Sequence, residues 1–184
     1  LEDQRALAGV DISVRYLDLV EGQYLTRARP ATDAQTILNA VASWKREVGG
    51  GVVALPAGAG WTGHNLWARL SRIRWILPAL APNPDHVYLR DLILPALSRD
   101  EVWLYEELPY RWGRPGHDAA SRVSQAAGRR ERMLERPVDR TAKAAAIGEY
   151  HSQVPWLRGR RWMPRIDDPR GLPRRERYWV LERS

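Results

Sequence analysis

Residues 80–91 have the sequence LAPNPDHVYLRD, which combines helix-start residues with a histidine and two aspartates. Asn83 is a good N-cap residue, and Pro84 suits the first helical position because the backbone N–H that proline lacks would have no partner there. Asp85 then faces the positive end of the helix dipole. These residues predict that a helix begins at Pro84 and that His86 lies in its first turn.

His86 is the residue of this stretch that most directly suggests chemistry. The positive end of the helix disfavours imidazolium, so His86 would stay neutral and keep a lone pair for a metal ion. A second interpretation stays open, because Asn-Pro-Asp is common helix-start chemistry and a histidine in a first turn is often a hydrogen-bonded structural residue.

The composition limits the class of protein. A chain of 184 residues with 44% hydrophobic residues fits one compact domain with a substantial core. It contains no cysteine, so any zinc would need His, Asp or Glu ligands. The sequence has no apolar stretch long enough for a membrane span and no signal-peptide pattern, and we expect a cytoplasmic protein.

The net charge of +7 suggests acidic partners such as nucleic acid or anionic lipid. Of the 29 basic residues, however, only Lys45 and Lys143 are lysines and the other 27 are arginines. A GC-rich coding sequence produces such a bias without selection for binding. We therefore expect no nucleic-acid partner, and a basic module that binds nucleic acid or anionic membrane is kept as an alternative.

The pattern of apolar residues predicts alternating strands and helices. Before residue 60 it predicts a helix end at 1–8, a strand at 13–19, a helix from Thr32 or Asp33 to Val48, and a strand at 51–55. After residue 60 it predicts helices at 65–80 and from Asn83 to Leu94 or Leu97, a strand at 102–106, helices at 117–134 and 139–153, and a strand at 177–181. The first strand, helix and strand suggest a parallel βαβ unit.

This alternation predicts an α/β fold, a three-layer Rossmann-like sandwich with a mostly parallel sheet that is incomplete at the N-terminus. In such sheets ligands bind at the carboxyl ends of the strands. The loops after Leu19, Leu55 and Glu106 are therefore candidate sites.

The segment 65–80 has Leu or Ile every three or four residues, with Trp and Arg beside this apolar stripe. Such a helix suits contact with an anionic membrane surface. The alternative is that it packs on its own domain or covers a pocket.

Short segments along the chain together resemble one known family in the same order. They are YLDL at 16–19, GQY at 22–24, LPAGAG at 55–60, NPDH at 83–86, LYEELPY at 104–110, residues 143–153, and YW at 178–179. This order resembles the PIG-L (LmbE-like) family, zinc enzymes that remove the acetyl group from N-acetylglucosamine-type sugars. The resemblance implies a single, partial PIG-L-like α/β domain over 1–184, with an insertion at about 61–82.

The resemblance also implies the chemistry and the residues that perform it. Zinc would lower the pKa of a bound water, and the resulting hydroxide would attack the acetamide carbonyl of an N-acetylated amino sugar. His86 would be a zinc ligand, Asp85 its orienting partner, and Asn83 at most a donor to the oxyanion. Tyr105 and Glu106 would contact the sugar, although an ordinary strand end explains them almost as well.

Two departures from the family bear on activity. Nothing in this sequence corresponds to the family's first motif, His-Pro-Asp-Asp, which supplies two zinc ligands and the general base. Asn83 also stands where the family usually has a histidine. We therefore expect a fragment that is inactive alone, with the remaining zinc ligands in a missing N-terminal segment. A non-catalytic homologue or partner subunit is the alternative.

Overall fold

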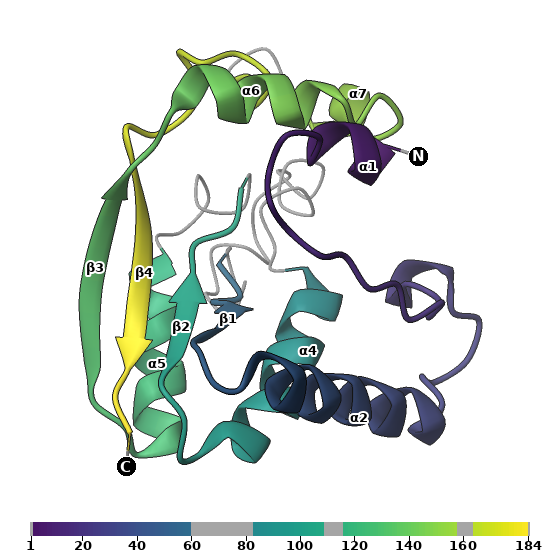
Figure 1. The fold of residues 1–184 in the computed structure, drawn as a ribbon, viewed down its shortest axis with the longest axis vertical. Helices are drawn as coiled ribbons and strands as arrows, with labels where there is room; N and C mark the ends of the chain where they lie inside the picture. The colour runs from purple at the N-terminus through teal and green to yellow at the C-terminus, as the bar shows by residue number, and fades with distance from the viewer. Residues whose placement is uncertain (1, 60–82, 109–115, 158–163, 184) are drawn as a thin grey trace, which may run out of the picture. The chain divides into compact units, whose positions relative to one another are not determined.

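The computed structural model describes residues 2–59, 83–108, 116–157 and 164–183 (Figure 1). The chain divides into two compact units, one of residues 1–15 and 135–177 and the other of residues 16–134 and 178–184. The insertion predicted at about 61–82, with its amphipathic stretch 65–80, lies outside the described residues. The prediction of a single domain stays a prediction.

A four-stranded sheet has the strand order β1-β2-β4-β3. The strands are β1 (Val53–Pro56), β2 (Val102–Tyr105), β3 (Glu131–Pro137) and β4 (Arg175–Leu181). β1 pairs with β2 in parallel, whereas β2 pairs with β4 in the antiparallel direction (Figure 1). The fold is therefore α/β, as predicted, but its sheet is mixed rather than mostly parallel.

The parallel pair is connected through α4 (Pro84–Ile93), which packs against β1 and continues into the 3-10 helix η3 (Leu94–Leu97). Parallel neighbours need such a crossover, because a tight turn can only reverse the chain direction. The observed βαβ unit is thus β1-α4-β2, one unit later in the chain than the predicted one.

The predicted strand at 13–19 is wrong, because residues 11–21 form no regular secondary structure. The alternation itself is present, since Leu17 and Leu19 pack against the core while Tyr16 is exposed. Within the described parts of the chain, no strand pairs with this segment. Asp18 also has a φ of 52°, which interrupts the extended backbone that a strand requires.

The predicted helix before β1 is confirmed as α2 (Ala31–Val48). It ends at Gly49, whose φ of 66° is left-handed, as helix ends commonly are. Its N-cap is Pro30, so neither Thr32 nor Asp33 caps it as predicted. Two short helices precede it, α1 (Glu2–Ala6) and the 3-10 helix η1 (Gly22–Tyr24).

The helix predicted at 117–134 is only half correct. α5 (Gly116–Ala127) ends at Gly128, which has a φ of 62°, and the chain then enters β3. The charged sequence of β3 resembles an exposed helix face, which is why the pattern did not predict a strand there.

The helix predicted at 139–153 is confirmed only as far as α6 (Arg140–Gly148), because residues 149–153 are not helical, and a separate short helix, α7 (Val154–Leu157), follows the predicted span. Asp139 caps α6 as predicted, because its carboxylate accepts hydrogen bonds from the N–H groups of Thr141 and Ala142. The last predicted strand, 177–181, lies within β4.

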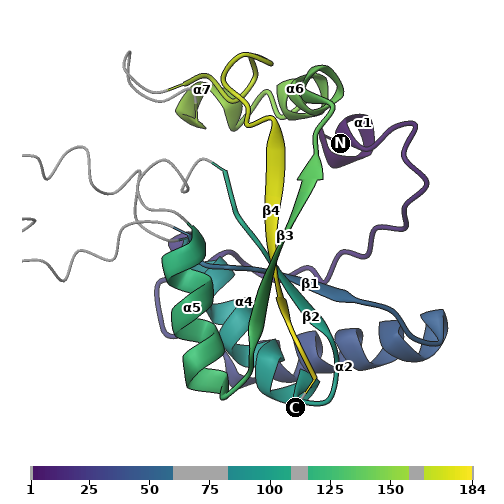
Figure 2. The ribbon, with the colours of Figure 1, turned by 90° about the vertical axis from the view of Figure 1, so that its left-hand side faces the viewer.

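The core of the second unit lies where alternate strand residues meet the helices. The buried apolar residues include Val53 and Leu55 of β1, Val102 and Leu104 of β2, Trp179 and Leu181 of β4, Ile37, Ile93, Leu97, Ala120 and Val123. Figure 2 shows α4 and α5 on the same side of the strands. This packing fixes α4 against the sheet and therefore fixes the position of its N-terminus.

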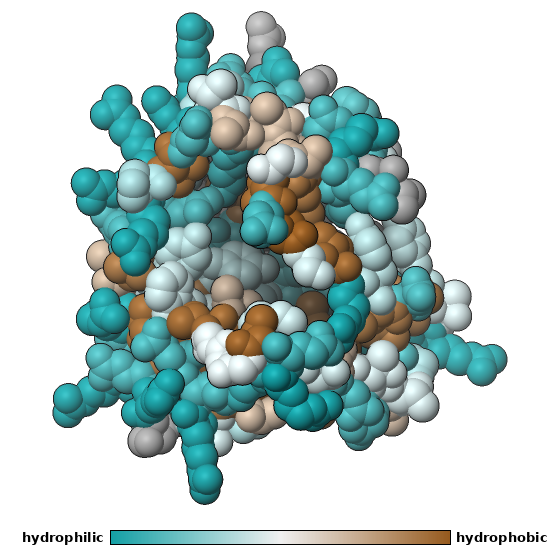
Figure 3. Space-filling view, viewed as in Figure 1, coloured by the Kyte–Doolittle hydropathy of each residue, from teal (hydrophilic) through white to brown (hydrophobic). Residues whose placement is uncertain are grey.

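Hydrophilic side chains cover much of the face drawn in Figure 3, with hydrophobic patches between them. The exposed large apolar side chains include Val10, Ile12, Val14, Tyr16 and Tyr24. No helix in the described part of the chain has both the length and the apolar character needed to cross a membrane.

Candidate functional site

The N-terminus of α4 forms as the sequence predicts. Asn83 is the N-cap residue and its side-chain oxygen accepts a hydrogen bond from the N–H of Asp85 at 2.9 Å. Pro84 occupies the first turn, where its missing N–H leaves no unmet bond. His86 therefore projects from a capped and well-defined first turn.

His86 contacts a buried carboxylate. Its Nδ1 atom lies 3.4 Å from Oε1 of Glu107, and the His86 side chain is 32% exposed whereas that of Glu107 is only 3% exposed. Glu107 comes two residues after the end of β2. The imidazole is thus half-buried, with one ring nitrogen directed at an acidic group that has little access to water.

The same carboxylate holds the loop after β1. Glu107 Oε1 accepts a hydrogen bond from the N–H of Gly58 at 2.8 Å, and Oε2 accepts one from the N–H of Ala59 at 3.0 Å. Two backbone donors compensate in part for the cost of burying the carboxylate. They also fix the orientation of both oxygens, one of which faces His86.

Arg90 also holds this loop, through Ala57, the residue before Gly58. The Arg90 Nη1 atom donates a hydrogen bond to the carbonyl of Ala57 at 2.6 Å, and the residue is buried. Gly58 has a φ of 74°, and a Cβ atom there would lie 2.4 Å from Arg90 Nη1. Glycine is therefore needed at position 58 both for its backbone conformation and for the approach of Arg90.

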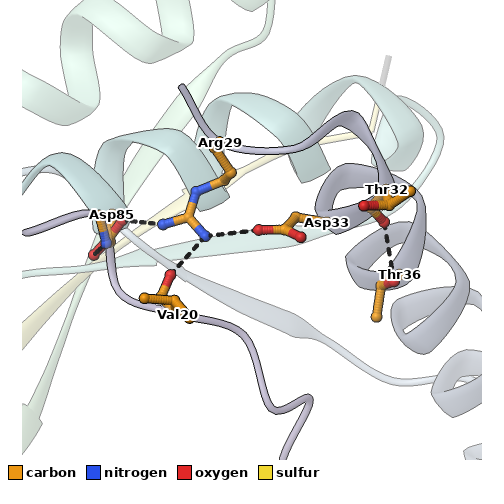
Figure 4. A network of polar contacts seen from close by, with 7 residues as sticks. Val20, Arg29, Thr32, Asp33, Thr36 and Asp85 are labelled. Atoms are coloured by element: carbon orange, nitrogen blue, oxygen red, sulfur yellow. Dashed lines mark hydrogen bonds and ion pairs between the residues drawn. The ribbon is translucent and has the colours of Figure 1, made fainter. Parts of the chain in front are cut away.

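Asp85 is tied to a different loop and to Arg29 (Figure 4). Its Oδ2 atom accepts a hydrogen bond from the N–H of Gly22 at 2.8 Å, and its Oδ1 atom accepts one from Arg29 Nη2 at 2.6 Å. Arg29 also donates to the Val20 carbonyl at 3.0 Å and to Asp33 at 3.2 Å. Each oxygen of Asp85 thus has a partner that orders this loop, and its predicted role beside a metal stays a prediction.

The three loops that the sequence analysis selected meet at the start of α4. Gly22, after Leu19, bonds to Asp85, and Gly58, after Leu55, bonds to Glu107, which follows Glu106. The carboxyl ends of the parallel strands β1 and β2 bring the last two loops together, as α/β sheets do at their ligand sites.

Tyr105 and Glu106, the predicted sugar contacts, lie at the end of β2 and are both half-buried. The Tyr105 carbonyl accepts a hydrogen bond from the N–H of Ala57 at 2.8 Å. Burial raises the pKa of the Tyr105 phenol, and the nearby Glu107 carboxylate raises it further. Both residues thus adjoin the site through Glu107, and their contact with a sugar stays a prediction.

The described residues do not complete a zinc site. They contain no group of three His, Cys, Asp or Glu side chains that could hold a metal ion, whereas a catalytic zinc needs three protein ligands. The His86–Glu107 pair resembles the arrangement around one ligand only in its proximity, because zinc-bound histidines commonly give their other ring N–H to a carboxylate, and the 3.4 Å contact here does not have hydrogen-bond geometry.

Of the other histidines, His151 is described, with a side chain that is 69% exposed and an Nε2 atom 3.9 Å from Glu149. His64 lies outside the described residues.

A groove of about 690 Å³ lies between α4 and α5. Its lining includes Gly58, Val87, Arg90, Leu94, Ala119 and Val123. Gly58 and Arg90 thus connect the groove to the loop after β1, whereas Asn83, Asp85, His86, Tyr105 and Glu106 do not line it.

Glu107 and Arg29 were not predicted from the sequence as site residues. Tyr105 and Glu106 were selected because they end the strand predicted at 102–106, along which Val102 and Leu104 are buried. β2 ends at Tyr105, the alternation stops, and Glu107 is the residue that turns inward. The signal that could have found it is the pair of adjacent acids directly after an apolar strand.

Comparisons of the chain with protein-family models, with curated proteins and with solved structures found no match.

Proposed function

We propose that this chain contributes the His86 part of the active site of a PIG-L-like N-deacetylase, a zinc-dependent hydrolase. Its substrate would be an N-acetylglucosamine-type sugar or glycoconjugate. The observation that carries the proposal is the contact between His86 Nδ1 and the buried carboxylate of Glu107, beside the carboxyl ends of β1 and β2. A half-buried imidazole beside a carboxylate, next to loops at the ends of parallel strands, is an arrangement that suits a metal ligand.

The proposal includes the finer fold, a three-layer Rossmann-like sandwich. It is supported by the parallel pair β1 and β2, which is connected through α4. It is also supported by the order of the family-like segments, because three of them supply residues that meet at the start of α4: Gly22, Gly58 and the 83–86 segment.

Zinc is the proposed cofactor, with His86 as one ligand and with the others from a segment that carries the His-Pro-Asp-Asp motif, which this sequence lacks. The described residues alone do not complete the site. Within the proposal, Asn83 and Asp85 stay beside the metal and Tyr105 and Glu106 face the sugar.

The first experiment uses the 184-residue chain alone. After zinc is added and loosely bound metal is removed, we expect no stoichiometric zinc by elemental analysis and no acetate release from an N-acetylglucosamine conjugate. The reason is that one imidazole is too few ligands for a catalytic zinc. One tightly held zinc in each chain would contradict this account of the ligands.

The second experiment uses a form extended by a segment with the His-Pro-Asp-Asp motif. We expect bound zinc and acetate release, and we expect His86→Ala to lower both together, because a ligand acts on binding and on chemistry. His151→Ala is the matched control, since that side chain is exposed, and it should change neither. Unchanged zinc and activity in His86→Ala would overturn the proposal, and an extended form with neither would favour the non-catalytic homologue.

A further inference from the structure

Glu107 is a buried acid that the proposed function does not yet use. Its two oxygens accept hydrogen bonds from the N–H groups of Gly58 and Ala59, at 2.8 and 3.0 Å. These backbone donors belong to the loop after β1. The carbonyl of Ala57, the residue before Gly58, accepts a hydrogen bond from buried Arg90. The carboxylate is therefore held by a loop that is itself held from a second direction.

One of these oxygens also faces His86. Glu107 Oε1 lies 2.8 Å from the Gly58 nitrogen and 3.4 Å from His86 Nδ1. The 3.4 Å contact does not have the geometry of a hydrogen bond. A carboxylate oxygen nevertheless attracts an N–H and repels a ring lone pair, so the neutral tautomer of His86 with the proton on Nδ1 is the favoured one beside Glu107.

The position of the imidazole ring follows from the same contacts. The first turn of α4 sets where His86 begins, because Asn83 caps the helix. Glu107, held by two backbone donors and with a side chain only 3% exposed, then gives the ring one fixed neighbour. A charged acceptor that cannot rotate fixes a ring more firmly than a solvated one.

We propose that Glu107 is a positioning residue for His86, holding it in the tautomer with the proton on Nδ1 and the lone pair on Nε2. The inference rests on the proposed function in one respect only, namely that the Nε2 lone pair of His86 binds zinc. A carboxylate in this place would orient His86 toward a zinc ion and make it a stronger donor. The tautomer itself requires no metal.

The competing account is that Glu107 only holds the loop after β1. In that case Gly58 and Ala59 need the carboxylate, and the proton of His86 can be on either nitrogen. The two accounts therefore differ in the tautomer of His86 and not in the stability of the fold.

The experiment is nitrogen NMR of the 184-residue chain labelled with ¹⁵N-histidine, at a pH well above the ordinary imidazole pKa of about 6.5. Long-range proton–nitrogen correlations distinguish a protonated ring nitrogen from one with a lone pair. We expect His86 to show one dominant form, with the proton on Nδ1, and exposed His151 to show a mixture. If the wild-type protein shows a dominant Nε2-protonated form of His86, that result alone overturns the inference.

A variant pair tests the cause. Glu107→Met removes the acceptor at similar length, and we expect the single His86 form to be lost. Glu106→Met is the matched control, because it removes the neighbouring acid, and it should leave the His86 signals unchanged. A folded Glu107→Met protein that keeps the Nδ1-protonated form would overturn the inference. If this variant does not fold, the wild-type tautomer still decides.

A separate measurement distinguishes this inference from the proposed function. In the extended form, Glu107→Met should weaken zinc binding by roughly 10- to 100-fold, as loss of a carboxylate behind a ligand does elsewhere. The predicted tautomer without any zinc binding would remove the proposed function and leave the positioning role intact. Zinc bound through an Nε2-protonated His86 would remove the positioning role and keep the function.

Discussion

Arg29 Nη2 donates a hydrogen bond to Asp85 Oδ1 at 2.6 Å, although 56 positions separate the two residues in the chain. The side chains are 15% and 24% exposed, so this ion pair is only weakly screened by water. The guanidinium also lies 5.0 Å from the centre of the Tyr88 ring (Figure 4 shows the polar part of the network). One arginine thus connects the residues before α2 to the first turn of α4.

Arg29→Met should therefore lower the free energy of unfolding by about 2 kcal/mol, because it leaves Asp85 partly buried without its charged partner. Arg5→Met is the matched control. Arg5 pairs with Glu149 at side-chain exposures of 53% and 39%, and such exposed pairs contribute little. Urea denaturation of both variants measures the loss of unfolding free energy. Equal losses would show that the Arg29 pair contributes no more stability than an exposed pair.

Gly58→Ala should destabilise the protein by more than Gly49→Ala. Both glycines have positive φ values, 74° and 66°, so each alanine incurs a backbone cost of about 1–2 kcal/mol. At Gly49 a Cβ atom meets nothing within 4 Å, whereas at Gly58 it would lie 2.4 Å from Arg90 Nη1. Denaturation midpoints measure the difference, and equal midpoints would mean that Arg90 moves aside without cost.

The sequence predicted best where a local rule determines the structure. Asn83 and Pro84 start a helix and Gly49 ends one, and in each case the atoms concerned lie within a few residues of one another. The segment 13–19 failed because a strand needs a partner, and alternation along one segment does not say whether a partner exists.

The candidate site, like the fold, was predicted from the sequence only in part. The loops at the strand ends were selected from the general behaviour of α/β sheets, and they do meet at α4. Arg29 and Glu107 were not selected, because their roles come from contacts with residues 56 and 49 positions away. The two acids after an apolar strand mark Glu107 as a candidate, but no local pattern identifies its partner in the loop after β1.

Tyr105 predicts how stability depends on alkaline pH. Burial raises the pKa of its phenol, so above the ordinary tyrosine pKa of about 10 the unfolded chain loses this proton first. The folded state then binds more protons than the unfolded state, and the free energy of unfolding falls as the pH rises. Below pH 10 the contribution is fully present.

Tyr105→Phe removes this titration. The stability of the wild type relative to Tyr105→Phe should be constant from about pH 7 to 9 and should decline from about pH 10 upward. Urea denaturation of both proteins at several pH values measures it. Parallel curves across the whole range would contradict a raised phenol pKa.

Asn83 allows a test that separates capping from chemistry. Its side-chain oxygen accepts the N–H of Asp85 at 2.9 Å, so the side chain already has the rotamer of an N-cap. Asn83→Ala should cost about 1 kcal/mol, because the cap is lost, whereas Asn83→Asp keeps an equivalent oxygen and should keep the stability. Asn39→Ala is the matched control. Asn39 is exposed inside α2, where alanine favours the helix, so this variant should not lose stability.

Thermal unfolding of the three variants decides the capping role, which fails if Asn83→Asp lowers the midpoint as much as Asn83→Ala. The extended form then tests the alternative use of the same side chain. If the Asn83 amide instead donated to an oxyanion, Asn83→Asp would remove that donor and lower turnover by roughly a hundredfold or more with zinc still bound. Because one rotamer does not serve both purposes well, and the observed one caps α4, we expect turnover in Asn83→Asp to stay within about tenfold of the wild type.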